Sequence, residues 1–384
     1  MFTEIMHYLI KDLMTVKRGV DSDLWLIAER GNDAQDNGFH LYCYILNHQE
    51  LGITPVYLIT RQSPDYEKVK NQGGRTVEPG SREHYELMYS AGALISTHPY
   101  GFTPDMEVYH RMAEYGLFSP PGLNVFLQHG ITDKDDPSLH REVFKPDVFV
   151  TSSDSEKELA LNTFHQPAEY LANIGMCRYD RLATAREPQK QSLVMATWRE
   201  WLKGLSKTEF LETDYAKRWR TLLFDKSFIF ELSKAGYKLV FYMHPELKEY
   251  IHLFTHEGIE VATDNLQTQM MKSEVLITDY SSIYFDMAYM HRNVVFWQFD
   301  NRRYSTEQYN GLTLDYNRFG YLARDCGDVK RAVLACIAAS EVSSTENVYG
   351  DEEFIYDFFS HHDANQCART IDILRAKQIL HKQG

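Results

Sequence analysis

Three histidines follow short apolar runs that predict buried β-strands. His98 lies in the sequence Ser-Thr-His-Pro, His129 in Gln-His-Gly and His244 in Met-His-Pro. An imidazole titrates at about pH 6.5, so a histidine at such a position can accept a proton from a hydroxyl group at neutral pH. The glycine after His129 is expected to allow a tight turn that exposes the ring. Each histidine alone also fits an ordinary loop residue, but three of them at strand ends favour catalysis or binding.

A hydroxyl-rich loop follows a further apolar run, Val275–Thr278. Asp279, Ser281 and Ser282 stand in this loop, and a helix is predicted to begin at Ile283. Hydroxyl groups and the unpaired N–H groups of a helix start suit a phosphate group. The alternative is an ordinary helix cap, in which Asp279 or Ser281 accepts hydrogen bonds from the first N–H groups of the helix.

Two more polar segments follow predicted strands. Thr197, Trp198 and Arg199 come after an apolar run in the second half of the chain, where a guanidinium can reach a phosphate and an indole can flank a base. A surface salt bridge explains the arginine equally well. In the first half, the acidic loop 29–38 contains Asp36 and Asn37, which suit a polyol or a sugar or are simply solvated.

The elements that must position these residues alternate short apolar runs with helical stretches, which is typical of parallel α/β units. The predicted strands are 24–28, 55–60, 93–96, 125–128 and 148–151, then 192–196, 238–242, 259–262, 275–278 and 294–297. The predicted helices are 38–48, 82–90, 105–115, one that begins at Asp154, then 214–235, 265–272, 283–290, 329–339 and 364–381. We therefore predict two Rossmann-type domains, residues 1–185 and 186–384, with the last helix closing the second domain.

Composition and charge exclude several classes of protein. The chain has 384 residues, of which 43% are hydrophobic, so it fits two globular domains and is not a disordered protein. Its 54 acidic and 40 basic residues give a net charge of −14, which disfavours binding to nucleic acid. The five cysteines are scattered and form no C-x-x-C pair, which argues against a disulfide framework or a zinc site. We expect no metal and no cofactor.

Membrane contact is expected to be peripheral. No apolar run approaches the about 20 residues that a membrane span needs, and the N-terminus does not read as a secretory signal. The aromatic and basic stretch from Trp198 to Phe230 suits a membrane surface. It also suits an amphipathic helix that covers a sheet, and we favour this explanation.

Together these segments resemble the CDP-glycerol glycerophosphotransferase family, which builds teichoic acids and related capsular polymers. The resemblance rests on Glu29-Arg30, Asp36-Asn37-Gly38, Gln128-His129-Gly130, Thr197-Trp198-Arg199, His244-Pro245, the block from Thr278 to Asp286, and the stretch from Phe299-Asp300 to Gly320. These motifs span about residues 24–325, which is most of the chain.

The resemblance implies an α/β, GT-B-like fold in which two Rossmann-type domains face a central cleft, with C-terminal helices. It implies that the first domain faces the acceptor and that the second binds the donor nucleotide, CDP-glycerol or CDP-ribitol. It also implies a lipid-linked or polymeric acceptor, and a cytoplasmic enzyme that is peripheral at the inner face of the plasma membrane.

Roles for individual residues follow from the same resemblance. His129 is expected to be the general base, and His244 a donor-phosphate contact or acid. The other donor-binding residues are expected to be Thr197, Arg199, Thr278, Asp279, Ser281, Ser282 and Asp286, and the acceptor-side residues Asp36, Asn37 and His98. Family members often carry a basic residue shortly before His-Pro, where this chain has Tyr242-Met243, so a positive charge for the donor is expected from elsewhere, with Arg199 as the candidate.

The sequence thus predicts a metal-independent transferase that moves a polyol phosphate from a CDP-alcohol to a hydroxyl acceptor and releases CMP. Its kcat/KM is expected to fall on the acid side with an apparent pKa of about 6–7, because an unprotonated imidazole is needed. Two alternatives remain open: a GT-B glycosyltransferase that uses a nucleotide sugar, and a non-catalytic subunit of a polysaccharide-assembly complex.

Overall fold

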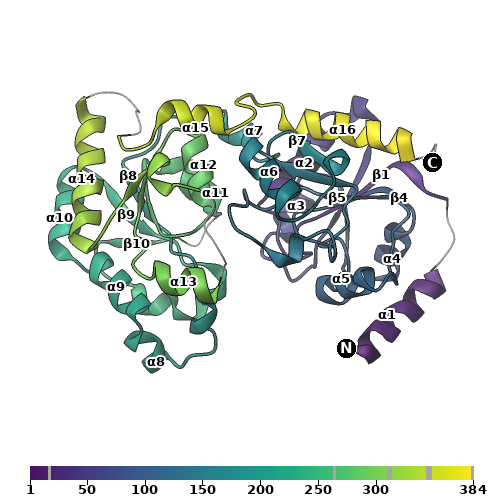
Figure 1. Cartoon of the computed structure of the whole chain (residues 1–384), viewed down its shortest axis with the longest axis horizontal. Coiled ribbons are helices and arrows are strands. Elements are labelled where there is room, and N and C mark those ends of the chain that lie inside the picture. The colour runs from purple at the N-terminus through teal and green to yellow at the C-terminus, as the bar shows by residue number, and fades with distance from the viewer. Residues whose placement is uncertain (16–18, 263–264, 309–313, 343–347, 382–384) are drawn as a thin grey trace. The chain divides into compact units, whose positions relative to one another are not determined.

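The computed structural model describes residues 1–15, 19–262, 265–308, 314–342 and 348–381 (Figure 1). The chain forms two compact units. Unit 1 comprises Met1–Ile131, Asp136–Arg181 and Phe359–Gly384, and unit 2 comprises Thr132–Asp135 and Leu182–Phe358. Part of the motif between Phe299 and Gly320, namely residues 309–313, lies outside the described residues.

Unit 1 is built on a seven-stranded sheet with the order β3-β2-β1-β4-β5-β6-β7, in which all neighbouring strands run parallel. The strands are β1 (Asp21–Ala28), β2 (Thr54–Leu58), β3 (Arg75–Val77), β4 (Ala91–Ser96), β5 (Leu123–Phe126), β6 (Val148–Thr151) and β7 (Leu171–Asn173). Apolar side chains fill the central strands because both faces of the sheet are covered by helices.

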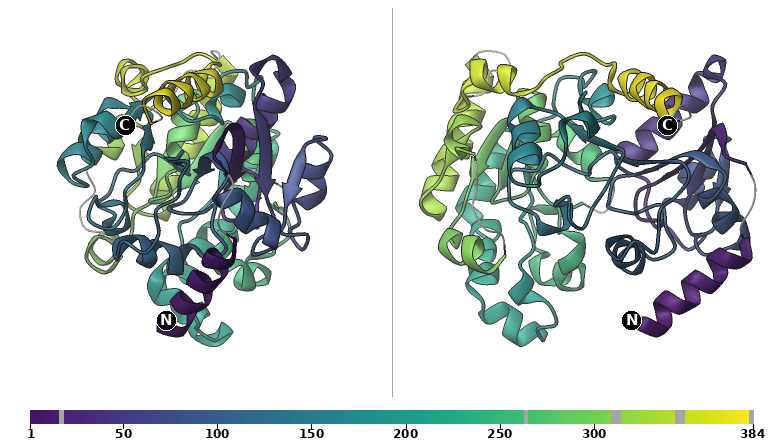
Figure 2. Two further views of the ribbon diagram at one scale, coloured as in Figure 1. Left: turned by 90° about the vertical axis from the view of Figure 1, so that its right-hand side faces the viewer. Right: turned by 45° about the vertical axis from the view of Figure 1, so that its right-hand side comes forward.

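The helices of unit 1 pack on both faces of this sheet. They are α1 (Phe2–Thr15), α2 (Asn37–Asn47), α3 (Tyr66–Lys70), α4 (Arg82–Met88), α5 (Met106–Glu114), α6 (Asp154–Asn162) and α16 (Gln366–His381), with short 3₁₀ helices at Gln49–Leu51, Pro137–Leu139 and Ala168–Tyr170. α7 (Tyr179–Leu182) stands where the chain leaves the unit. α16 packs against α2 and β5, whereas α1 runs along the edge of the unit and contacts α4 and α5 (Figure 2).

Unit 2 repeats the architecture with six parallel strands in the order β10-β9-β8-β11-β12-β13. The strands are β8 (Gln191–Val194), β9 (Lys238–Phe241), β10 (Ile259–Val261), β11 (Val275–Thr278), β12 (Asn293–Phe296) and β13 (Tyr321–Leu322). In both units the chain starts in the middle of the sheet, adds two strands on one side and then continues on the other, which is the Rossmann order.

The helices of unit 2 also cover both faces of its sheet. They are α8 (Lys207–Glu212), α9 (Asp214–Leu223), α10 (Lys226–Lys234), α11 (Leu266–Lys272), α12 (Ile283–Tyr289), α13 (Asn301–Glu307), α14 (Cys326–Val342) and α15 (Glu352–Phe358), with 3₁₀ helices at Glu200–Leu202, Pro245–Phe254 and Tyr316–Arg318. α9, α10 and α14 share one face, and α11, α12 and α15 pack together on the other. Trp219 and Phe228 are buried in the core beneath α9 and α10, so the aromatic stretch 198–230 mainly covers the sheet.

The prediction of two parallel α/β sheets is confirmed, and the structure differs from the sequence-based elements at a few points. β3, β7 and β13 were not predicted. The single helix predicted for 214–235 is two helices, because Asp225 caps a new one through its bond to the N–H of Phe228. The last helix belongs to unit 1 rather than unit 2, since Cys367, Ile371 and Leu374 are part of the unit 1 core.

Over the described parts of the chain, every helix is too short or too polar to cross a lipid bilayer.

Candidate functional site

The carboxyl ends of β8 and β11 bring two of the predicted segments together in unit 2. These strands are neighbours at the point where the strand order reverses, which is where open α/β sheets bind ligands. Residues 197–199 follow β8 and residues 279–282 follow β11. His244 follows β9, the other neighbour of β8.

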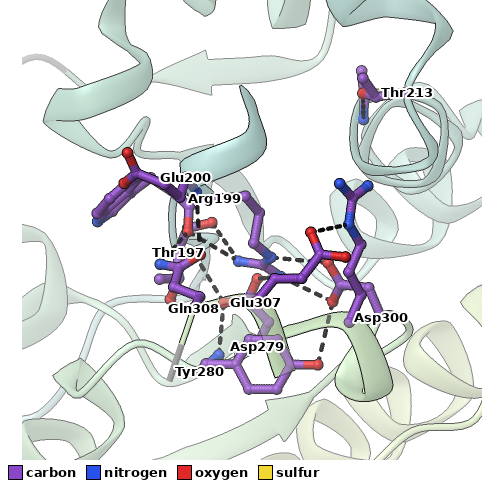
Figure 3. A network of polar contacts seen from close by, with 12 residues as sticks. Thr197, Arg199, Glu200, Thr213, Asp279, Tyr280, Asp300, Glu307 and Gln308 are labelled. Atoms are coloured by element: carbon purple, nitrogen blue, oxygen red, sulfur yellow. Dashed lines mark hydrogen bonds and ion pairs between the residues drawn. The ribbon is translucent and has the colours of Figure 1, made fainter. Parts of the chain in front are cut away.

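Arg199 is the centre of a buried polar network at this edge of the sheet (Figure 3). Its side chain is 0% exposed, and its Nη2 donates to Asp279 Oδ2 at 2.7 Å. Nε and Nη2 donate to the two carboxylate oxygens of Asp300 at 2.9 and 3.1 Å. The guanidinium also lies 4.9 Å from the ring centres of both Tyr280 and Tyr304. Burial lowers the pKa of Arg199, but the charge of Asp279 and the charge and hydrogen bond of Asp300 outweigh this effect and raise it.

In this geometry Arg199 and Asp279 bind each other and the neighbouring backbone, and their contact with a donor phosphate stays a prediction. Arg199 Nη1 donates to the carbonyl oxygen of Thr197 at 2.7 Å, so its donors are used inside the network. Asp279 is also fully buried, and its Oδ1 accepts the N–H groups of Thr197 at 2.8 Å and Tyr280 at 2.7 Å. The pair ties the loop after β8 to the loop after β11.

The hydroxyl groups of the β11 loop are available for a ligand. Ser282 precedes α12, yet its side chain makes no capping bond, and among the described residues neither its hydroxyl nor that of Ser281 has a hydrogen-bond partner. Thr197 Oγ1 is likewise buried without a partner, a rare state for a polar atom. These three hydroxyls do not act as helix caps, so the capping alternative does not explain them.

Two other residues that were predicted to bind the donor nucleotide are buried inside unit 2. Thr278 is fully buried, and its hydroxyl donates to the carbonyl oxygen of Met195 at 2.7 Å. Asp286 lies in α12 and is also buried. Both side chains lie inside the unit, and their contact with the donor stays a prediction.

His244 lies beside Trp198. Its ring centre is 6.3 Å from that of the indole, and its Nδ1 accepts a hydrogen bond from the N–H of Glu246 at 3.3 Å. A neutral imidazole whose Nδ1 accepts a bond carries its proton on Nε2, so this atom is a hydrogen-bond donor. The half-buried His244 is suited to donate to a phosphate oxygen.

In unit 1, His98 and His129 are stacked. They follow the neighbouring strands β4 and β5, and their ring centres are 4.6 Å apart at an angle of 12°. The left-handed residue of the His129 turn is Gln128, with a φ of 62°, and not the following glycine that the sequence suggested. Gln128 tolerates this conformation because its buried Nε2 donates to Val150 O at 3.1 Å and to Glu156 Oε1 at 2.8 Å.

Arg178, which sequence reasoning missed, holds this turn from behind. Its Nη1 donates to Asp36 Oδ1 at 2.8 Å and to the carbonyl oxygen of His129 at 3.0 Å. The side chain of Asn37 accepts from the N–H of Arg178 at 3.0 Å and donates to the carbonyl oxygen of Gln128 at 2.7 Å. Asn37 is fully buried, and both it and Asp36 hold the His129 turn through Arg178 and Gln128; their contact with an acceptor stays a prediction.

The acidic loop after β1 is organised around Glu29. This buried carboxylate accepts three backbone N–H groups, from Gln35 at 2.8 Å, Asp36 at 2.7 Å and Phe39 at 3.1 Å. Burial, Asp36 and Asp33 raise its pKa to about 8. The side chain of Glu29 therefore stabilises the backbone of its own loop, a role that the sequence did not indicate.

The surroundings of His129 lower the pKa of its imidazole. Although the residue is exposed at the surface, loss of solvation and then the positive charge of Arg178 lower its pKa to about 4, with Arg30 adding to the effect and Asp136 opposing it. Desolvation and His129 also lower the pKa of His98. This pKa is lower than the apparent value of about 6–7 that the sequence predicted for kcat/KM.

Comparisons with known proteins agree with the motifs. Residues 10–374 match the model of the family described as CDP-Glycerol:Poly(glycerophosphate) glycerophosphotransferase. The minor teichoic acid biosynthesis protein GgaB of Bacillus subtilis (strain 168) is 31% identical over 316 residues, which cover 78% of this chain and 34% of GgaB. The chain thus spans about a third of the length of that relative.

Solved structures share the fold. The wall teichoic acid polymerase TagF superposes with a TM-score of 0.69 at 16% identity, over 97% of this chain and 93% of the TagF chain. Anabaena HepE in complex with UDP and glucose superposes with a TM-score of 0.50 at 7% identity, over 93% of this chain and 100% of that one. The predicted GT-B-like fold is confirmed.

Proposed function

Because the chain belongs to the CDP-glycerol:poly(glycerophosphate) glycerophosphotransferase family, we propose that it transfers glycerol phosphate, or another polyol phosphate, from a CDP-alcohol to a hydroxyl group of a teichoic acid or capsular acceptor. CMP is the second product. The observation that carries this proposal is the group of hydroxyls without partners, those of Thr197, Ser281 and Ser282, at the strand reversal of unit 2.

Unit 2 is proposed to bind the donor. The Ser281 and Ser282 hydroxyls donate to the pyrophosphate, and burial of Thr197 Oγ1 is explained if a ligand oxygen completes its hydrogen bonding. His244 Nε2–H donates to the phosphate of the departing CMP, and Trp198 lies beside it to flank the base. These donors stabilise the charge that develops on the leaving group.

Unit 1 is proposed to supply the base. The acceptor hydroxyl transfers its proton to the imidazole of His129, and its oxygen forms a bond to the phosphorus that carries the polyol. The bond from that phosphorus to the bridging oxygen breaks, and both electrons leave with CMP. His98 stacks on the ring of His129, and Arg178 holds the backbone of the His129 turn.

A ligand panel distinguishes this function from the two alternatives. We expect CDP-glycerol or CDP-ribitol and CMP to raise the melting temperature, since a ligand at 100 times its Kd stabilises the folded state by about 2.7 kcal/mol. A rise with UDP-sugars alone would assign the chain to the nucleotide-sugar glycosyltransferases. Stabilisation by none of these nucleotides would favour the non-catalytic subunit.

Replacement of both Ser281 and Ser282 by Ala should weaken binding of CMP and CDP-glycerol. Each hydrogen bond from a hydroxyl to a charged phosphate contributes about 1.5–3 kcal/mol, whereas the melting temperature should change little because neither hydroxyl has a partner in the fold. Titration calorimetry measures the affinity.

Ser206→Ala is the matched control for this experiment. Ser206 caps α8 in a complete capping box, so its loss should lower the stability by about 1 kcal/mol and leave donor affinity unchanged. If the Ser281/Ser282 double variant behaves like Ser206→Ala, these serines support the fold and do not bind the donor.

We further propose peripheral contact with the cytoplasmic face of the membrane, where a lipid-linked acceptor would be found. Support comes from α1 and not from the stretch 198–230, which the sequence offered as a membrane-contacting segment. α1 exposes a row of large apolar side chains at helical spacing, namely Phe2, Met6, Ile10, Leu13 and Met14, with 78%, 42%, 52%, 75% and 84% of their surface accessible. An amphipathic helix of this kind inserts its apolar face at the level of the lipid headgroups.

Replacement of Ile10 and Leu13 by Ser should abolish flotation with anionic lipid vesicles. Both side chains are exposed, so the fold loses no buried contact and the melting temperature should stay within a few degrees of wild type. Tyr115→Ser removes a comparably exposed side chain elsewhere in unit 1 and serves as the control. Unchanged flotation of the α1 variant would remove this helix from the membrane proposal.

A further inference from the structure

The loop after β11, residues 279–282, is called the donor loop because it is proposed to bind the donor. Binding of the anionic donor there needs a positive charge that its serines, Thr197 and Arg199 do not provide. Ser281, Ser282 and Thr197 are neutral donors, whereas the phosphates of a CDP-alcohol are anionic. Arg199 shares its single positive charge between the carboxylates of Asp279 and Asp300 and is fully buried. An anion bound without a cation would lose solvation without adequate compensation.

A lysine from a distant part of the sequence is anchored at this loop. Residues 132–135 belong to unit 2, and Asp133 fixes them there because its buried Oδ2 accepts hydrogen bonds from the hydroxyls of Tyr284 at 3.2 Å and Tyr316 at 3.0 Å. The next residue, Lys134, donates from Nζ to the carbonyl oxygen of Tyr280 at 2.8 Å. Its ammonium is thus held at the residue that precedes Ser281.

We propose that Lys134 binds a phosphate group of the donor nucleotide. The inference rests on the proposed function and gives the loop after β11 its cation. An ammonium group has three N–H donors, and that of Lys134 donates to the carbonyl oxygen of Tyr280 at 2.8 Å and lies 3.6 Å from Asp133 Oδ1. A compact charge at the end of a mostly buried side chain, 12% exposed, is well suited to a phosphate contact.

A second lysine near the strand ends is used differently. Lys203 Nζ lies 4.2 Å from the ring centre of Trp198 and forms ion pairs with Glu200 at 3.3 Å and Glu246 at 3.9 Å. Its charge is thus offset by two carboxylates on the surface. Lys134 Nζ also lies 3.6 Å from one carboxylate oxygen, Asp133 Oδ1, but it contacts the backbone of the loop after β11 directly.

The test compares ligands that differ only in their phosphates. Affinities of cytidine, CMP and CDP-glycerol are measured by calorimetry, with displacement titrations for the weaker ligands, for wild type, Lys134→Gln and Lys134→Arg. Glutamine removes the charge but retains an N–H donor for the carbonyl oxygen of Tyr280. Lys238→Met is the matched control, because Lys238 begins β9 and so lies at the opposite end of the same sheet.

We expect Lys134→Gln to weaken binding of CMP and CDP-glycerol by about 10- to 100-fold and to leave cytidine binding within a factor of two. Lys134→Arg should retain most of the affinity, and Lys238→Met should match wild type. Equal weakening of all three ligands would mean that Lys134 only shapes the loop, and unchanged affinities would mean that it plays no part; either result overturns the inference. Wild type that binds neither CMP nor CDP-glycerol would instead refute the proposed function itself.

Discussion

His129→Ala should lose turnover by about 10²–10⁴-fold while it binds CDP-glycerol almost normally, because abstraction of the acceptor proton matters only in the transition state. Single-turnover rates and donor affinities measured on the same preparation separate the two effects. His244→Ala should lose both turnover and donor affinity, since a phosphate contact exists in the ground state as well. If folded His129→Ala retains near-wild-type turnover, the base lies elsewhere, and His98, stacked 4.6 Å away, is the next residue to replace.

The pH dependence of kcat/KM tests independently whether His129 is the general base. The imidazole must be unprotonated to act as base, and its pKa is about 4 in this fold, so kcat/KM should stay level from pH 7.5 to about 5 and fall only below that. Arg178 lowers this pKa, whereas Asp136 raises it. Arg178→Gln should therefore move the acid limb to higher pH and Asp136→Asn to lower pH. If the acid limb of the kcat/KM profile moves in neither variant, His129 is not the titrating group.

Arg199→Met should destabilise unit 2 by about 3–5 kcal/mol, because removal of the guanidinium leaves the fully buried carboxylate of Asp279 without its ion pair. Urea unfolding followed by tryptophan fluorescence reports on this unit, since four of the five tryptophans, Trp198, Trp201, Trp219 and Trp297, lie within it. Most of the loss in the free energy of unfolding should appear in the absence of any ligand.

Arg331→Met provides the control for this measurement. Arg331 is 72% exposed and pairs with Asp328 one helical turn away, so its loss should cost at most about 1 kcal/mol. Should Arg199→Met be as stable as Arg331→Met and yet fail to bind the donor, the guanidinium contacts the nucleotide directly, as the sequence suggested.

The sequence predicted the central strands because each is a short apolar run that both faces of a covered sheet require. It did not predict β3, β7 and β13, which have only three, three and two residues and lie at or toward the sheet edges, where too few side chains are buried to set a pattern. The break before α10 was missed for a local reason, since a helix cap at Asp225 interrupts an otherwise continuous helical pattern.

Sequence patterns picked out the segments at the strand ends but not the direction in which their side chains point. Arg199 and Asp279 stand at strand ends and look like ligand residues, yet they form a buried pair that is completed by Asp300, 101 positions further on. Arg178 and Lys134 stand in no motif, and their roles come from contacts with residues more than 45 positions away. Such contacts depend on the tertiary fold and leave no local signature.

Neither unit is a continuous stretch of chain, and this bears on how the protein can be divided or recombined. A fragment that ends at residue 185 lacks α16, and so exposes the core surface that Ile371 and Leu374 cover. A fragment that starts at residue 186 lacks Asp133, which leaves the buried hydroxyls of Tyr284 and Tyr316 without their acceptor. Chimaeras between family members that aim to exchange donor preference must therefore exchange residues 132–135 together with 182–358. They must also take α16 from the same parent as the rest of unit 1.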